Sequence, residues 1–114
     1  MMYEILILPH FRKQLKHYAK KYRTLKQDLM ESLTSFDAEP ATHLGRNIYK
    51  IRLRSRDSGK GKSGGFRVII LIRQERRLIP LTIFAKNERS TMTLEEINSH
   101  LEDVLRELQG HKEN

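Results

Sequence analysis

The sequence predicts an α+β domain: a small, mostly antiparallel sheet of about four strands, with a helical hairpin before it and one helix after it. Apolar residues recur at helical spacing in three segments and alternate with polar ones, or run together, in four others. The segments follow in the order strand, two helices, three strands, helix, and short turns join the last three strands. The 114 residues, of which 38% are hydrophobic and 32% charged, suit one compact domain. We expect it to span residues 1–109, with a flexible tail at 110–114.

The N-terminal part is predicted to form a strand and a helical hairpin. The apolar run Tyr3–Leu8 is stopped by Pro9, which favours a short strand. Helices are predicted at His10–Tyr22 and Thr24–Phe36, the second beginning with a capping box from Thr24 to Gln27. Their apolar stripes are Phe11, Leu15, Tyr18 and Tyr22 in the first helix, and Leu25, Leu29, Leu33 and Phe36 in the second.

The remaining elements are predicted from alternation and capping signals. Three consecutive strands are expected at Asn47–Arg54, Phe66–Arg73 and Leu78–Phe84. Pro80 cannot donate a hydrogen bond to a neighbouring strand, so it must lie at an edge, a bulge or a strand start. The last helix is predicted at Leu94–Leu108, where Thr93 and Glu96 form a second capping box.

Several classes of protein are excluded by composition and spacing. There is no cysteine, so neither a disulfide nor a zinc ribbon can form, and no apolar run is long enough to span a bilayer. The N-terminus lacks a basic leader, so we expect a cytoplasmic protein without a membrane partner. The loop at 59–63 fails as a P-loop because the first glycine is replaced by Arg56 and a strand follows it. The five histidines show no metal or catalytic spacing and no carboxylate cluster could hold magnesium, so no cofactor is expected.

Positive charge is concentrated in one region. The formal net charge is +8, and the stretch from Arg46 to Arg77 holds eleven Lys and Arg against Asp57 and Glu75, a local balance of +9. Such a region attracts polyanions through phosphate contacts and counterion release, although a solvated surface would show the same charge.

The strand at 47–54 sorts its side chains by chemistry. Tyr49, Ile51 and Leu53 alternate with three cations, Lys50, Arg52 and Arg54. Successive cations on one face of a strand stand about 7 Å apart, so two of them can flank one phosphodiester. A strand with one dry and one wet face is the simpler interpretation, but all three outward positions are cationic, which favours a binding or catalytic face.

Arg67 points to the same region. It enters the apolar run FRVIILI directly after two glycines, so it is expected at the edge of the core. A guanidinium in that position needs an anionic partner, either from the protein or from a ligand.

Three motifs together resemble the RelE family of toxin ribonucleases. They are Tyr49-Lys50-Ile51-Arg52-Leu53-Arg54, Ser63-Gly64-Gly65-Phe66-Arg67-Val68 and Ala85-Lys86-Asn87-Glu88-Arg89-Ser90. The order of the predicted elements is also similar, so the resemblance covers nearly the whole chain. The glycine-lysine loop and the ending IFAKNERSTMTLEEI are most similar to the HigB-like branch.

The resemblance implies an endoribonuclease that cuts messenger RNA, in many members on the ribosome, without a metal ion. It also implies a cognate antitoxin, which we expect to be a helix-turn-helix protein encoded by the neighbouring gene, with operator DNA bound only through that antitoxin. By position, the catalytic residues are Lys50, Arg52, Arg67 and Lys86. The residues expected to bind RNA around them are Arg54, Lys60, Lys62, Asn87 and Arg89.

The chain departs from the best-studied branch of the family at two positions. That branch has an arginine where this chain has Asn87, and a tyrosine near Thr93, where none occurs here. Two other functions stay open on the sequence. One is a ParE-like toxin that acts on a protein such as gyrase. The four cations predicted to converge speak against it, because a toxin that only inhibits a protein does not need them. The other is a simple RNA-binding module, which usually presents aromatic side chains for base stacking.

Overall fold

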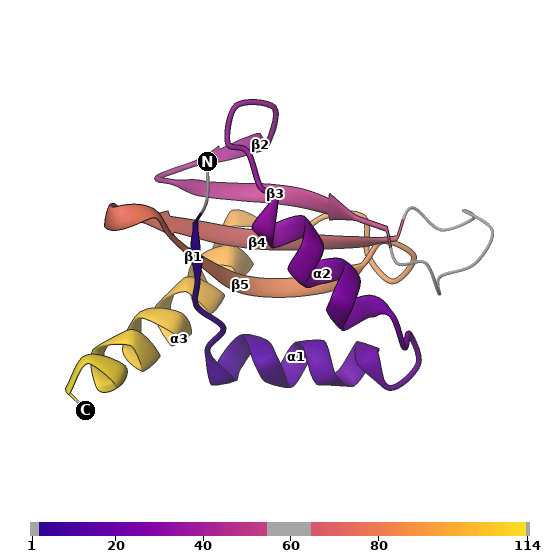
Figure 1. The fold of residues 1–114 in the computed structure, drawn as a ribbon, viewed down its shortest axis with the longest axis horizontal. Coiled ribbons are helices and arrows are strands. Elements are labelled where there is room, and N and C mark those ends of the chain that lie inside the picture. Colours follow the sequence, from indigo (N-terminus) through magenta and orange to yellow (C-terminus); the bar gives the residue numbers. More distant parts are fainter. Residues whose placement is uncertain (1–2, 55–64, 114) are drawn as a thin grey trace.

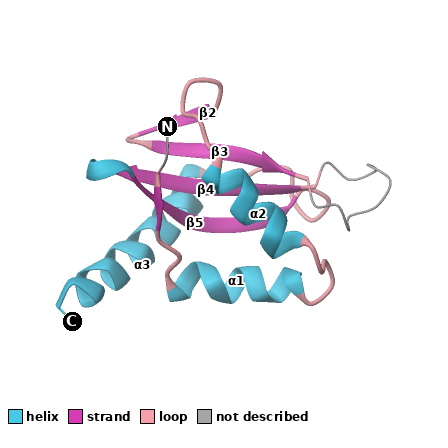
Figure 2. Cartoon of the chain, in the orientation of Figure 1, coloured by secondary structure: helices cyan, strands magenta, loops and turns pink. Residues whose placement is uncertain are grey.

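The protein forms a twisted sheet with helices on both faces. The structure is a computed structural model that describes residues 3–54 and 65–113. Figure 1 shows α1 and α2 on one side of the sheet and α3 on the other, and Figure 2 shows the same arrangement by element type. The elements are β1 (Glu4–Ile5), α1 (Pro9–Ala19), α2 (Leu25–Thr34), β2 (Thr42–Gly45), β3 (Ile48–Leu53), β4 (Phe66–Arg73), a 3₁₀ turn (Gln74–Arg76), β5 (Arg77–Ala85) and α3 (Leu94–Glu113).

The sheet confirms the predicted fold class. Its strand order is β1-β5-β4-β3-β2, and β3, β4 and β5 are consecutive antiparallel strands. β1 pairs parallel to β5, so the sheet is mixed at one edge. The described chain thus holds five strands rather than about four, because β2 pairs antiparallel with β3 at the other edge.

The hairpin of β2 and β3 turns without glycine at its two central positions. Arg46 and Asn47 have φ angles of 50° and 66°, and Gly45 before them has φ of 102°. Two successive positive φ values are the signature of the tight turns that match the twist of a hairpin, and asparagine tolerates this region well. Gly45 and Asn47 are thus a local turn signal for this hairpin, and β2 is the strand that was not predicted from the sequence.

Two hydrophobic cores lie on opposite faces of the sheet. β4 lies in the middle of the sheet, so its side chains are buried on both faces. Phe66, Val68 and Ile70 pack with the apolar stripes of α1 and α2. Ile69 and Leu71 face the other way and pack with α3. The continuous apolar run of β4 follows from its place between two cores.

Pro80 lies at a β-bulge, one of the three places predicted for it. Ile69 pairs with Thr82 while Ile70 pairs with Pro80, so Leu81 is the extra residue on β5. The missing N–H of Pro80 therefore falls where the ladder is already irregular.

Some predicted boundaries were wrong. β1 covers two residues rather than six, because the chain leaves β5 there to begin α1 at Pro9. The first helix ends at Ala19 rather than Tyr22, and the last continues to Glu113 rather than ending at Leu108.

The two predicted capping boxes had opposite outcomes. Thr24 has an αR backbone and makes no capping hydrogen bond, and its hydroxyl donates to Asp28 instead, over 2.9 Å. At α3 the box is confirmed. The Thr93 N–H donates to the Glu96 carboxylate over 2.9 Å, and the Glu96 N–H donates to the Thr93 hydroxyl over 3.1 Å.

Candidate active site

The candidate site lies at the end of the sheet where β3 ends, β4 begins and β5 ends (right-hand side of Figure 1). Tyr49, Ile51 and Leu53 belong to the core beneath α1 and α2. Because side chains alternate along a strand, Lys50 and Arg52 point to the face that carries α3. The predicted sorting of β3 into an apolar and a cationic face is therefore confirmed.

Arg67 is the buried member of the site. It is paired across the ladder with Arg52 on one side and with Phe84 on the other, and only 5% of its surface is exposed. Its guanidinium donates to the Phe66 carbonyl over 3.2 Å. Burial lowers the pKa of Arg67, and the positive charge of Arg52 lowers it further. An anion bound beside the two guanidinium groups would offset both effects.

Lys86 lies on a turn that leaves β5 beside the start of β4. Its N–H donates to the Gly65 carbonyl over 2.9 Å, and its side chain is half-buried. Gly65 has φ of 72°, and a Cβ there would lie 2.4 Å from the main-chain oxygen of Leu53. Only glycine allows the start of β4 to approach the end of β3 this closely.

The fold thus places Lys50, Arg52 and Arg67 on neighbouring strands and Lys86 on the turn that follows the next strand. Arg52 and Arg67 are direct cross-strand neighbours. Lys50 lies on β3 two residues before Arg52 and is paired with Ile69 of β4. Lys86 directly follows Ala85 of β5, the strand that pairs with β4 on its other edge. Convergence of all four charged ends on a single phosphate stays a prediction.

The predicted RNA-binding residues have different surroundings. Arg54 and Asn87 are exposed next to the site, as an RNA contact requires. Lys60 and Lys62 lie outside the described residues. Arg89 is engaged by the protein itself, as described next.

Arg89 bridges the turn and the start of α3. Its guanidinium donates to both carboxylate oxygens of Glu96, over 2.6 and 2.9 Å, and lies 5.7 Å from the centre of the Phe84 ring. This contact lowers the pKa of Glu96 to about 2. An RNA contact by Arg89 would therefore compete with Glu96, so we regard Arg89 first as a structural link.

A pocket of about 470 Å³ opens at the edge of β3, beyond its last pair with β2. It is lined by Lys50, Ile51 and Arg52 of β3 and, on the opposite wall, by residues of α2 and the segment that follows it, including Phe36 and Ala41. The lining is thus mixed, with apolar residues such as Phe36 and Ala41 beside polar ones such as Asp37, and it includes two residues of the candidate site.

Comparison with known proteins decides the family. The sequence model of the RelE toxin of the RelE/RelB toxin–antitoxin system matches residues 10–113. The chain belongs to the RelE toxin family. Among solved structures, the E. coli toxin RelE, an arginine-to-alanine double mutant in the free state, matches with 22% identity and a TM-score of 0.49, over 88% of this chain and 94% of that one. No match was found among curated protein sequences.

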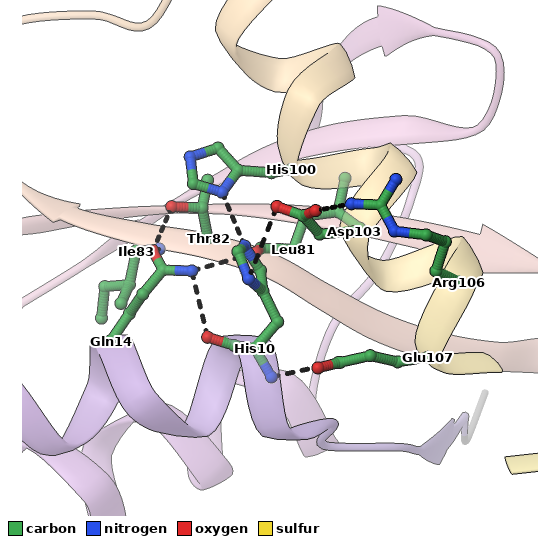
Figure 3. Close-up of polar contacts among 9 residues, drawn as sticks. All are labelled: His10, Gln14, Leu81, Thr82, Ile83, His100, Asp103, Arg106 and Glu107. Carbon is green, nitrogen blue, oxygen red and sulfur yellow. Dashed lines mark hydrogen bonds and ion pairs between the residues drawn. The ribbon is translucent and has the colours of Figure 1, made fainter. Parts of the chain in front are cut away.

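The RelE-family toxin also contains a histidine pair that the sequence analysis missed. His10 on α1 and His100 on α3 are hydrogen-bonded through their ring nitrogens over 2.8 Å (Figure 3). The main-chain N–H of His10 donates to the Glu107 carboxylate over 3.0 Å, and the Asp103 carboxylate lies 3.8 Å from Nδ1 of His10. Burial lowers the pKa of His100, and His10 lowers it further. The pair joins α1 to α3, and its other polar contacts are with Glu107 and Asp103 of α3, so we assign it a structural role.

Figure 3 also shows how α1 reaches β5 beside the histidines. The buried hydroxyl of Thr82 donates to the Gln14 side chain, which in turn donates to the Leu81 carbonyl over 3.4 Å. Within residues 3–54 and 65–113, no group of three or more His, Asp or Glu is arranged to hold a metal ion. In the same residues, no helix is long and apolar enough to cross a membrane.

Proposed function

We propose that this toxin is an endoribonuclease that cleaves messenger RNA on the ribosome and so stops translation in the cytoplasm. The observation that supports it is the pairing of Arg52 with the buried Arg67, next to Lys50 and Lys86. A desolvated guanidinium beside a second cation is suited to the charge of a phosphoryl group. A toxin that only blocks a protein target has no need of such a site.

The chemistry proposed is attack by the 2′-hydroxyl on the adjacent phosphate. The 2′-oxygen loses its proton and forms a bond to phosphorus, which passes through a pentavalent phosphorane. The bond to the 5′-oxygen then breaks, and that oxygen takes up a proton. Arg52 and Arg67 are proposed to stabilise the phosphorane, and a preorganised charge of this kind is usually the largest contribution to the rate.

Lys50 and Lys86 are proposed to serve the two proton transfers. Lys50 lies on β3 and Lys86 on the turn after β5, so the two lysines come from different elements beside the arginine pair. Attack and departure on opposite sides of a phosphorus need two such separate groups. The side chains themselves supply the positive charge, so the proposed reaction proceeds without a metal ion.

The proposal includes a cognate antitoxin, a helix-turn-helix protein encoded by the neighbouring gene. The pocket at the edge of β3 supports it, because Phe36, Ala41 and Ile51 offer apolar contacts beside Lys50 and Arg52. An acidic, partly disordered antitoxin segment that folds on binding would fit this combination and cover two of the proposed catalytic residues. We place the toxin in the HigB-like branch on its glycine-lysine loop and the segment at 83–97.

The test is cleavage of messenger RNA on programmed ribosomes by the purified toxin, measured at saturating toxin in single turnover. We expect cleavage that persists in a chelator and stops when the antitoxin is added. A parallel supercoiling assay with gyrase examines the ParE-like alternative. Inhibition of gyrase with no RNA cleavage would overturn the proposal.

A further inference from the structure

Tyr18 connects α1 to the turn that carries Lys86. Its hydroxyl donates to the Glu88 carboxylate over 2.6 Å and accepts the N–H of Ala85 over 3.3 Å. These two partners stand on either side of Lys86 in the sequence. One hydroxyl group thus holds both the start of the turn and its third residue.

The Tyr18 ring is itself held in place by aromatic packing. It meets Phe66 edge to face, with ring centres 5.1 Å apart, and His17 packs against it at 5.0 Å. Phe66 directly precedes Arg67 on β4 and is paired with Ala85 on β5. The anchor of the tyrosine ring is therefore part of the same strand as the buried arginine.

The hydroxyl remains a donor over the whole pH range in which such toxins would act. Burial raises the pKa of Tyr18 to about 12, with the hydrogen bond to Glu88 as the second cause. The other end of the turn is held independently, because Arg89 is bound by Glu96 of α3. Between these two ends the Lys86 N–H donates to the Gly65 carbonyl.

We propose that Tyr18 is a positioning residue, which places Lys86 against Arg52 and Arg67 through its hydrogen bonds to Ala85 and Glu88. The inference rests on the proposed ribonuclease function, since it concerns the geometry of that reaction. A catalytic group must stand within fractions of an ångström of its productive position, and a displacement of about 1 Å costs on the order of a hundredfold in rate.

The chain contains a matched control in Tyr22. Its ring also meets Phe66 edge to face at 5.1 Å, but among the described residues its hydroxyl makes no hydrogen bond. Tyr18→Phe and Tyr22→Phe therefore remove the same atom from rings packed on the same partner. Only the first change removes hydrogen bonds to Ala85 and Glu88.

The experiment is a double-mutant cycle on single-turnover cleavage of ribosome-bound messenger RNA, using Tyr18→Phe, Tyr22→Phe and Lys86→Ala. We expect Tyr18→Phe to lower the rate about tenfold or more at saturating toxin, because Lys86 is displaced. The half-saturating concentration should change by a smaller factor, since Asn87 is the only residue of the turn that we expect to bind RNA. Tyr22→Phe should leave the rate unchanged. In the Lys86→Ala background, Tyr18→Phe should cost nothing further, because the residue through which it acts is gone.

A second measurement does not depend on activity. Amide hydrogen exchange should accelerate at Ala85 and Glu88 in Tyr18→Phe and stay unchanged in Tyr22→Phe, with both variants fully folded under the conditions of the measurement. Equal rates and equal exchange in the two variants would overturn the inference and leave the ribonuclease proposal standing. An equal loss from Tyr18→Phe with and without Lys86 would also overturn it, because that indicates a general structural effect. Absence of cleavage by the unmodified toxin would overturn the ribonuclease proposal instead, and the exchange measurement would still decide whether Tyr18 holds the turn.

Discussion

Replacement of Arg67 by alanine should separate the activity of this toxin from its stability. Arg67 is 5% exposed and lies directly opposite Arg52, so its guanidinium is already desolvated before substrate arrives. A charge in that state interacts with a developing phosphorane far more strongly than an exposed one. Its loss should remove about 3 kcal/mol of transition-state stabilisation, on the order of a hundredfold in rate.

The same substitution should change folding stability little. It removes the packing of the aliphatic stem of Arg67 and its hydrogen bond to the Phe66 carbonyl, which destabilises the fold. It also removes a buried positive charge and its repulsion with Arg52, which stabilises the fold. We expect the two effects to offset each other to within about 1 kcal/mol in the free energy of unfolding.

The assay is single-turnover cleavage on ribosomes combined with urea unfolding of each variant. Arg73→Ala is the matched control, because Arg73 is the exposed last residue of the same strand and is remote from the site. Arg67→Lys should recover only part of the rate, since an ammonium group lacks the planar donor fork of a guanidinium. A rate for Arg67→Ala close to that of the unmodified protein, or an equal loss in Arg73→Ala, would refute the assignment.

Other predictions concern glycines and the histidine pair. Gly65→Ala should lower the free energy of unfolding by about 2 kcal/mol or more, since φ is 72° and a Cβ would lie 2.4 Å from a main-chain oxygen of β3. Gly110→Ala, with nothing within 4 Å, should raise it by about 0.5 kcal/mol because alanine favours a helix; urea unfolding measures both. Burial and His10 lower the pKa of His100 from 6.5, so the unfolded chain binds more protons, and stability should fall as pH drops through 6.5. Thermal melts from pH 8 to 5 should show a fall in melting temperature for the unmodified protein and a smaller fall for His100→Gln. Identical pH profiles for the two proteins would contradict the prediction.

The features predicted correctly from the sequence are those that depend on residues close together in the chain. The alternation in β3 separated Lys50 and Arg52 from the apolar residues because strand side chains point alternately to two faces. The capping box of Thr93 and Glu96 formed because its two residues lie within one helical turn. The box predicted at Thr24 did not form. The Thr24 hydroxyl is hydrogen-bonded to the Asp28 carboxylate and caps no main-chain N–H of the helix.

The features that the sequence left open depend on which distant segments meet. No local pattern shows that His10 meets His100 across two helices. Whether Arg89 binds Glu96 or a phosphate likewise depends on how the turn after β5 packs against the start of α3. The parallel pairing of β1 with β5 could not be predicted from a local pattern either, because the two strands are far apart in the chain.

By itself, the sequence determined the fold class, the cationic face of one strand and the family to which the chain is similar. The tertiary structure decided that Arg67 is buried opposite Arg52 and that Tyr18 reaches the Lys86 turn. The reason is physical: local periodicity selects the face of an element, whereas strand register and helix docking are selected by burial of the whole core. The distances that matter for chemistry are set by the second process, so they had to come from the folded chain.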